Sequence, residues 1–164
     1  MIDLRKNEIV IVDTLKNYLR TMARTCEVVR QNQIAKAPAY PYVSYTVTTP
    51  LSEMRGTYAE AKDGTLYRDM MQTWSFTAQS DDEDEAMELG MKLHDFFTAS
   101  GITVLADNGI TVRRVTNLTT RDNLLTIQYE FRKGLDVMFG LLYSITPDEQ
   151  PFKDVIETNE FKEV

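Results

Sequence analysis

The segment "KDGTLYRDMMQTWSFTAQS", residues 62–80, contains the strongest short-range folding signal in the chain. Asp63-Gly64 is typical of the turn of a β-hairpin, because glycine readily adopts the positive φ that such turns need. After the turn, apolar and hydroxyl-bearing residues alternate: Met70, Trp74, Phe76 and Ala78 share one face with Gln72, and Thr73, Ser75 and Thr77 share the other. This period of two predicts a half-buried strand and therefore a long hairpin.

The preceding stretch "PAYPYVSYTVTTP", residues 38–50, predicts the partner strand. Val43, Tyr45 and Val47 alternate with small polar residues. Pro38 and Pro41 lack backbone N–H donors, so they suit the entrance or the edge of a strand.

Two helices are expected beside these strands. Residues 4–23 place apolar side chains at three- and four-residue steps, which predicts an amphipathic helix. Ser80 and Glu83 have the spacing of a capping box and are followed by a run of acids, so a second helix is predicted to begin at Asp81 and to stop at Gly101.

The rest of the chain reads mainly as β structure. Two short strands are expected about Asn108-Gly109, and a longer strand is expected within residues 123–144, with Leu125, Ile127, Tyr129 and Phe131 on one face. Gly134 interrupts this last run and implies a bulge, kink or turn. The predicted fold is an α+β domain over residues 1–146, a mostly antiparallel sheet with two main helices and a long protruding hairpin, followed by an acidic extension over residues 147–164.

Composition narrows the function. The 164 residues, 43% of them hydrophobic, suffice for one domain, and no apolar run approaches the roughly 20 residues that a membrane span needs. The N-terminus lacks the pattern of a secretory signal, so we expect synthesis in the cytoplasm. A net charge of −7 argues against a protein that binds nucleic acid or an anionic membrane.

No catalytic, metal or cofactor site is predicted. Cys26 and His94 are the only residues of their types, so neither has the companions that a zinc site or a catalytic triad needs. One enzyme alternative remains: Asp148 with Glu160 and Lys162 has the letters of a metal-dependent nuclease motif. These residues lie in a polar terminal segment without β periodicity.

Basic residues gather around the last strands: Arg113, Arg114, Arg121, Arg132 and Lys133. A nucleic-acid patch would interleave aromatic residues, which are lacking among these five. A contact between subunits and a plain solvated face both remain open.

In chain order, the N-terminal helix, "PAYPYVSYTVTT", "TWSFTAQS", "DEDEAMELGMKLHDFF" and "YEFRKGLDVMF" resemble the neck and tail-terminator proteins of tailed bacteriophages, over roughly residues 5–144. The resemblance implies a virion protein made in the host cytoplasm, which forms a ring, expected as a hexamer, at the head-proximal end of the tail. Such a ring ends growth of the tail tube and provides the docking surface for the head connector. A head-completion or neck adaptor protein is the alternative.

The partners implied are further copies of the chain, the tail-tube protein and the connector or neck proteins, with DNA passing through the bore without specific binding. An acidic balance suits such a bore, because basic groups would bind phosphates. The hairpin from about residue 51 to 67 is expected to reach a neighbouring subunit or a neighbouring ring. Nine residues are the candidate interface: Arg55, Tyr58, Tyr67, Arg68, Arg113, Arg114, Arg132, Lys133 and Asp136.

Overall fold

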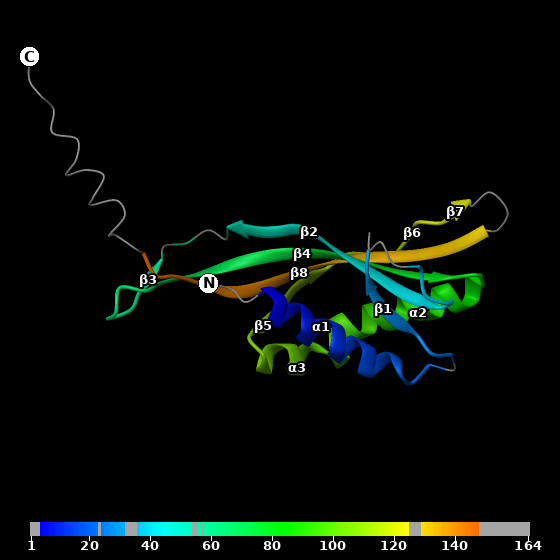
Figure 1. The fold of residues 1–164 in the computed structure, drawn as a ribbon, viewed down its shortest axis with the longest axis horizontal. Helices are drawn as coiled ribbons and strands as arrows, with labels where there is room; N and C mark the ends of the chain where they lie inside the picture. Colours follow the sequence, from blue (N-terminus) through cyan, green and yellow to red (C-terminus); the bar gives the residue numbers. More distant parts are fainter. Residues whose placement is uncertain are drawn as a thin grey trace, which may run out of the picture.

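A twisted, mostly antiparallel sheet forms the centre of the molecule, and helices cover one of its faces (Figure 1). The computed structural model describes residues 4–22, 24–31, 36–53, 56, 58–124 and 129–147. The strands are β1 (Glu27–Arg30), β2 (Tyr42–Glu53), β3 (Ala59–Glu60), β4 (Leu66–Ser80), β5 (Ile110–Val115), β6 (Thr119–Thr120), β7 (Asn123–Leu124) and β8 (Tyr129–Ile145). The helical segments are α1 (Leu4–Leu19), α2 (Glu83–Asp95), η1 (Phe96–Ser100), which is one π-helical turn, and α3 (Ile102–Asp107).

The strand order is β1-β2-β4-β8-β5. β1 and β2 run parallel, and the other described pairs are antiparallel. β3 pairs with β4, while β6 and β7 pair with β8. The predicted α+β class is therefore confirmed, with the strand at residues 66–80 at the centre of the sheet.

β4 places its alternating residues as expected. Met70, Trp74, Phe76 and Ala78 are buried, and the last three belong to the core shared with the helices. Gln72 lies on the same face and is only 2% exposed. Its amide donates to the Pro50 carbonyl at 2.8 Å and accepts the Trp74 indole N–H at 3.2 Å, so this buried polar side chain is hydrogen-bonded.

The core lies between the sheet and the helices and is rich in aromatic side chains. Phe97 from η1 packs between Phe76 of β4, at a ring-centroid distance of 4.7 Å, and Phe139 of β8, at 5.8 Å. Leu15 and Leu19 carry the apolar face of α1 into the same cluster. Burial of such faces is the main favourable contribution to folding.

The start of α2 differs from the prediction. The helix begins at Glu83, and its N-cap is Asp82, whose carboxylate accepts from the Glu85 N–H at 2.8 Å. Ser80 still belongs to β4, where it pairs with Phe131, so it cannot cap the helix. Instead its hydroxyl accepts from the Asp82 N–H at 3.1 Å and stabilises the turn before the helix.

The prediction of two strands about Asn108-Gly109 was wrong for the first of them. Residues 102–107 form α3, which buries Leu105 in the core, and only residues 110–115 form a strand, β5. Gly109, at φ 76°, donates to the Ala106 carbonyl at 2.9 Å. The Asn-Gly pair thus ends a helix, because helix ends also use left-handed glycine.

The break expected at Gly134 was also wrong. β4 and β8 pair without a register shift from Leu66 with Ile145 to Ser80 with Phe131, so the ladder passes straight through residue 134. Glycine is needed here for space: a β-carbon would lie 2.8 Å from the side chain of Arg121. Of the face predicted from four residues, Leu125 and Ile127 lie outside the described residues.

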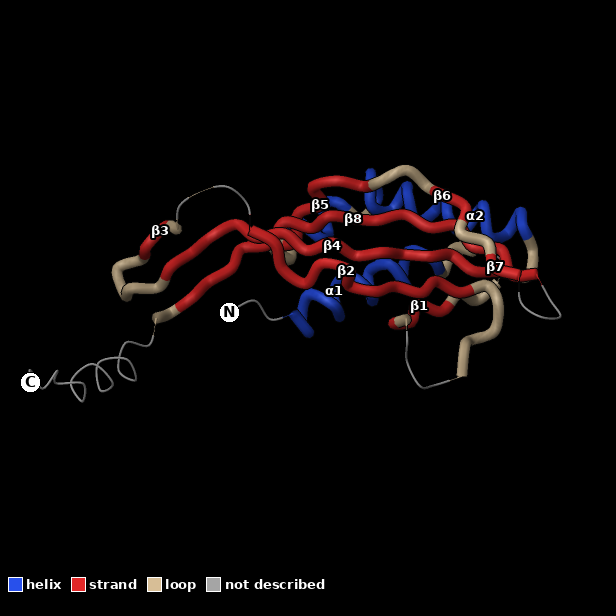
Figure 2. Tube along the Cα trace, turned by 90° about the horizontal axis from the view of Figure 1, so that it is seen from above, coloured by secondary structure: helices blue, strands red, loops and turns tan. Residues whose placement is uncertain are grey.

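One end of the sheet extends past the helices (Figures 1 and 2). We call residues 58–69 and 142–147, which form this end, the arm. Gly64 adopts φ 79° in its turn, and the Asp63 carboxylate accepts the Thr65 N–H at 3.0 Å, as expected of a hairpin at this place.

Candidate functional site

Three of the candidate interface residues belong to the arm. The Arg68 guanidinium lies 5.1 Å from the centroid of the Tyr58 ring and 3.3 Å from a Glu53 carboxylate oxygen. Tyr67 is half-buried where β4 pairs with both Ala59 and Ser144. Tyr58 is 37% exposed, so it offers an aromatic surface on the arm. Arg55 lies outside the described residues.

β5 brings two further candidates to the face of the sheet that the helices leave open, which we call the open face. The register between β5 and β8 shifts between Val112 and Arg114, which leaves Arg113 as an extra residue. A β-carbon on Gly140 would stand 2.5 Å from Arg113 Nε, so this arginine lies across the open face of β8. Arg114 stands opposite Met138 on that face. Both arginines are exposed.

Arg121 lies over the same face, one glycine further along β8. Its guanidinium donates to the Ser75 hydroxyl at 2.7 Å and to the Asp136 carboxylate at 3.1 Å, above Gly134. Asp136, a candidate residue, is therefore part of an intrachain ion pair. The spacing of six residues between the two glycines places both on one face of the strand, a signal that sequence reasoning missed.

Arg132 and Lys133 use their charges within the chain. The Arg132 guanidinium donates to the Glu130 carboxylate, which also accepts from the Tyr40 hydroxyl at 2.9 Å. The side chain of Lys133 is only 3% exposed, and its ammonium lies 3.3 Å from Asp122. These contacts hold the end of β8 to its neighbouring loops.

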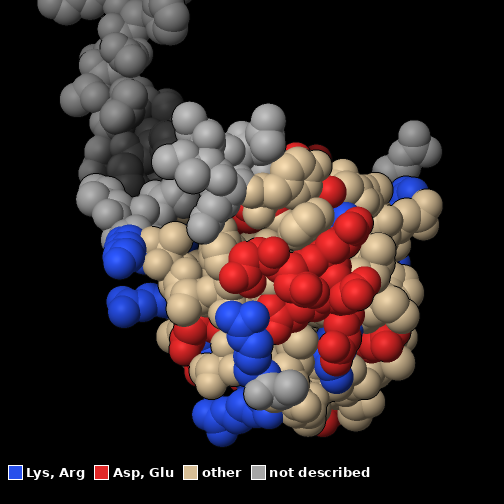
Figure 3. Space-filling view, turned by 90° about the vertical axis from the view of Figure 1, so that its right-hand side faces the viewer, with Lys and Arg blue, Asp and Glu red and all other residues tan. Residues whose placement is uncertain are grey.

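The end of the molecule opposite the arm carries a cluster of acids (Figure 3). It contains the acidic first turn of α2, Glu83, Asp84 and Glu85, preceded by Asp81 and Asp82. Only part of this charge is neutralised by basic side chains nearby, so the surface stays negative.

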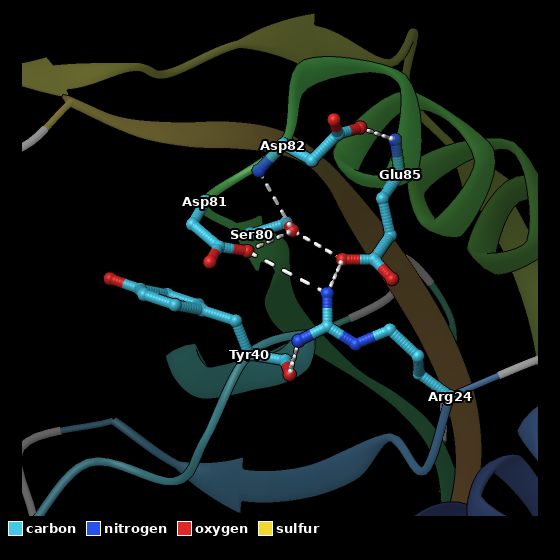
Figure 4. Close-up of polar contacts among 6 residues, drawn as sticks. All are labelled: Arg24, Tyr40, Ser80, Asp81, Asp82 and Glu85. Carbon is cyan, nitrogen blue, oxygen red and sulfur yellow. Dashed lines mark hydrogen bonds and ion pairs between the residues drawn. The ribbon is translucent and has the colours of Figure 1, made fainter.

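Arg24 ties three segments together beneath this cluster (Figure 4). Its guanidinium donates to Glu85 at 2.9 Å and to the Tyr40 carbonyl at 2.6 Å, and lies 3.7 Å from Asp81. The entrance of β2, which the prolines predicted, is thereby fixed to the start of α2. No sequence pattern marked Arg24 for this contact.

A pocket of about 280 Å³ opens beside β1. Its lining includes three basic residues, Arg30, Lys36 and Arg132, and three polar residues, Tyr42, Ser44 and Gln79. The polar three are hydrogen-bonded to one another: Tyr42 donates to Gln79 at 2.6 Å, and Gln79 donates to Ser44 at 2.6 Å. Nothing in this lining combines a nucleophile with a base.

Within the described residues, no group of three or more potential metal ligands gathers. Burial raises the pKa of the Cys26 thiol to about 12, and the nearby carboxylates of Glu27 and Glu85 add to the rise. A thiol in this state is a poor nucleophile. The residues of the nuclease alternative, Asp148, Glu160 and Lys162, lie outside the described residues.

The candidate residues therefore lie either on exposed surfaces or in ion pairs within the chain. A comparison with protein families adds a second line of evidence. A family model described as phage neck terminator protein matches residues 10–163. The chain belongs to the phage neck terminator family. This neck terminator chain is a structural protein of the phage neck, as the resemblance predicted.

Three further findings accompany this assignment. No curated protein matches the neck terminator chain significantly. Among the described helices, none has both the length and the apolar character required to cross a bilayer. The family match continues through residue 163, so the acidic segment after Pro147 lies within the matched region.

Proposed function

We propose that this chain forms a ring at the head-proximal end of the phage tail, where it ends growth of the tail tube and offers the docking surface for the head connector. Its partners are further copies of itself, arranged as a hexamer, together with the tail-tube protein and the connector or neck proteins. It is made in the host cytoplasm and incorporated into the virion. Membership of the phage neck terminator family supports this proposal.

The observation that carries the ring is the arm. A sheet end that no helix covers leaves the ring of Tyr58 37% exposed, and the chain gains stability when a neighbouring subunit buries it. In a heterologous ring each subunit presents two different surfaces to its two neighbours. The arm and the acidic cluster lie at opposite ends of the long axis, which supplies two such surfaces (Figures 1 and 3).

Charge supports passage of DNA without specific binding. The chain carries a net charge of −7. A bore lined by acidic groups repels phosphates, whereas a basic lining would hold DNA with an affinity that falls steeply with salt. The exposed candidate Tyr58 on the arm then faces a protein partner and not DNA.

The test shortens the arm without disturbing the sheet. Replacing residues 61–65 by Asn-Gly leaves Glu60 opposite Leu66 and closes them with a two-residue turn, while Tyr58→Ser removes the exposed ring. The control is Met91→Ser, since Met91 is 56% exposed on α2, away from the arm. Phage particles are assembled in the absence of this protein, and each purified variant is then added to test whether it restores normal assembly.

Electron microscopy of tail length and head attachment gives the readout. We expect the control to restore tails of uniform length joined to heads, and the shortened arm to leave overlong or headless tails. Restoration by the shortened arm, with circular dichroism showing the same fold, contradicts a role of the arm in the ring. Normal tails in the complete absence of the protein contradict the terminator function and favour the neck adaptor.

A further inference from the structure

An exposed apolar patch lies on the open face around Gly140. In the register of β4 with β8, Met71 stands opposite Gly140, and Met138 and Leu142 flank that glycine along β8. Leu142 is 61% exposed, the largest fraction among the exposed large hydrophobic residues described. The stem of Arg113 crosses the glycine and borders the patch.

The two basic residues at this patch have no ion pair among the described residues. Arg113 and Arg114 come together because the bulge in β5 turns both towards the open face. By contrast, Arg121 on the same face is paired with Asp136 at 3.1 Å. The patch therefore combines adaptable methionine surface with two available guanidinium groups.

The C-terminal segment of the chain has the complementary chemistry. Residues 148–164 carry six acids and two bases, together with five large apolar residues, Phe152, Val155, Ile156, Phe161 and Val164. Carboxylates match the free arginines, and the apolar residues match the exposed leucine and methionines. Charge complementarity of this kind favours the segment over a basic or neutral occupant.

The segment also starts in the right place. The described chain ends at Pro147, seven residues beyond Gly140 and two beyond the end of β8, so a chain returning over β8 needs roughly seven residues at about 3.3 Å each. Seventeen residues follow Pro147. A covalent connection this short gives a high effective concentration at the patch.

We propose that residues 148–164 fold back over the open face of their own chain, with acids paired to Arg113 and Arg114 and apolar side chains seated on Met71, Met138 and Leu142. This contact makes the acidic segment part of the folded unit. It forms in the isolated chain and so does not depend on the ring.

Trypsin tests the proposal in the full-length protein, because Lys153 lies within the segment. Docking protects the Lys153 site, and cleavage then follows the undocked fraction. We expect the double variant R113E/R114E and, separately, Leu142→Asp to accelerate cleavage after Lys153 by about tenfold. Arg20→Glu, a charge reversal at an exposed residue directly after the end of α1, leaves the rate unchanged.

Mass spectrometry quantifies cleavage after Lys153 at several protein concentrations, with circular dichroism as the check on folding. A rate that is independent of concentration supports docking within one chain, and a rate that falls with concentration overturns it in favour of docking on a second copy. Immediate cleavage in the unmodified protein, or no response to either patch variant, also overturns the proposal. Failure of the ring experiment leaves these outcomes unaffected.

Discussion

Arg121 lies directly over Gly134, and a β-carbon at residue 134 would stand 2.8 Å from three atoms of the arginine side chain. The glycine thus makes room for a guanidinium that donates hydrogen bonds to Ser75 on β4 and to Asp136 on β8. The position of the Arg121 side chain thus requires a residue without a β-carbon at position 134, 13 positions further along the chain.

Gly134→Ala is expected to destabilise the protein by about 1–3 kcal/mol, because the arginine must leave its partners or the backbone must shift. The double variant with Arg121→Ala provides the control. Removing the arginine vacates the space, so the cost of the alanine should fall by about 0.5–3 kcal/mol in a double-mutant cycle measured by chemical denaturation. Additive costs would show that the glycine has another role.

Phe97→Ala should lower the free energy of unfolding by about 3–5 kcal/mol. The ring is fully buried between Phe76 and Phe139, so its removal leaves a cavity between η1 and the sheet. The matched control, Met91→Ala on the exposed face of α2, is expected to change stability by less than about 0.5 kcal/mol. A similar loss in both variants would contradict this location of the core.

Lys133→Ala is expected to cost about 3 kcal/mol, the lower end of the range for breaking a buried ion pair, because Asp122 keeps some contact with water. The double replacement Lys133→Met with Asp122→Asn should recover part of this loss by removing both charges. Thermal unfolding distinguishes the variants. If Lys133→Ala is harmless, the ammonium does not stabilise the fold.

Stability is expected to fall in alkaline solution. Burial, aided by the Glu130 carboxylate, raises the pKa of Tyr40 from 10.0 to about 12, and burial also raises the pKa of Tyr42 and Tyr45. The folded state disfavours the phenolate form of Tyr40. The stability that the neutral Tyr40 hydroxyl contributes is therefore complete below about pH 10 and is lost as the pH rises towards 12.

Phenolate absorbance and denaturation midpoints between about pH 8 and pH 12 check this expectation. The variant Tyr40→Phe should show a smaller loss of stability across that window. A midpoint that does not change above pH 10 would contradict the proposed tyrosine environments.

The parts of the fold that were predictable depend on patterns within a few residues. The predictions of a strand along residues 70–78 and of a turn at Asp63-Gly64 were confirmed, because the local pattern and the tertiary burial agree there. The prediction at Asn108-Gly109 failed because a left-handed glycine suits a hairpin and a helix end equally well. Here the helix buries Leu105, and Asn108 donates to the Val104 carbonyl at 2.8 Å.

The surfaces were less predictable, because they depend on contacts between distant residues. Lys133 had the sequence context of a surface base, yet Asp122 across the strand end accounts for its burial. Tyr129 had the context of a core residue, yet it is 48% exposed, while its neighbour Glu130 is buried with Tyr40 and Arg132. Such contacts depend on where the loops place Asp122 and Tyr40, and the periodicity of a single strand gives no information about this.

The unbroken register of β4 with β8 has a mechanical consequence. A pull along the arm loads many interstrand hydrogen bonds simultaneously in shear, whereas a hinge between arm and body would let them open one after another. The arm is therefore expected to be stiff, because its two strands continue without interruption into the part of the sheet that packs on the aromatic core. A displacement at the tip of the arm is therefore transmitted to the helices as a tilt of β4 and β8 together.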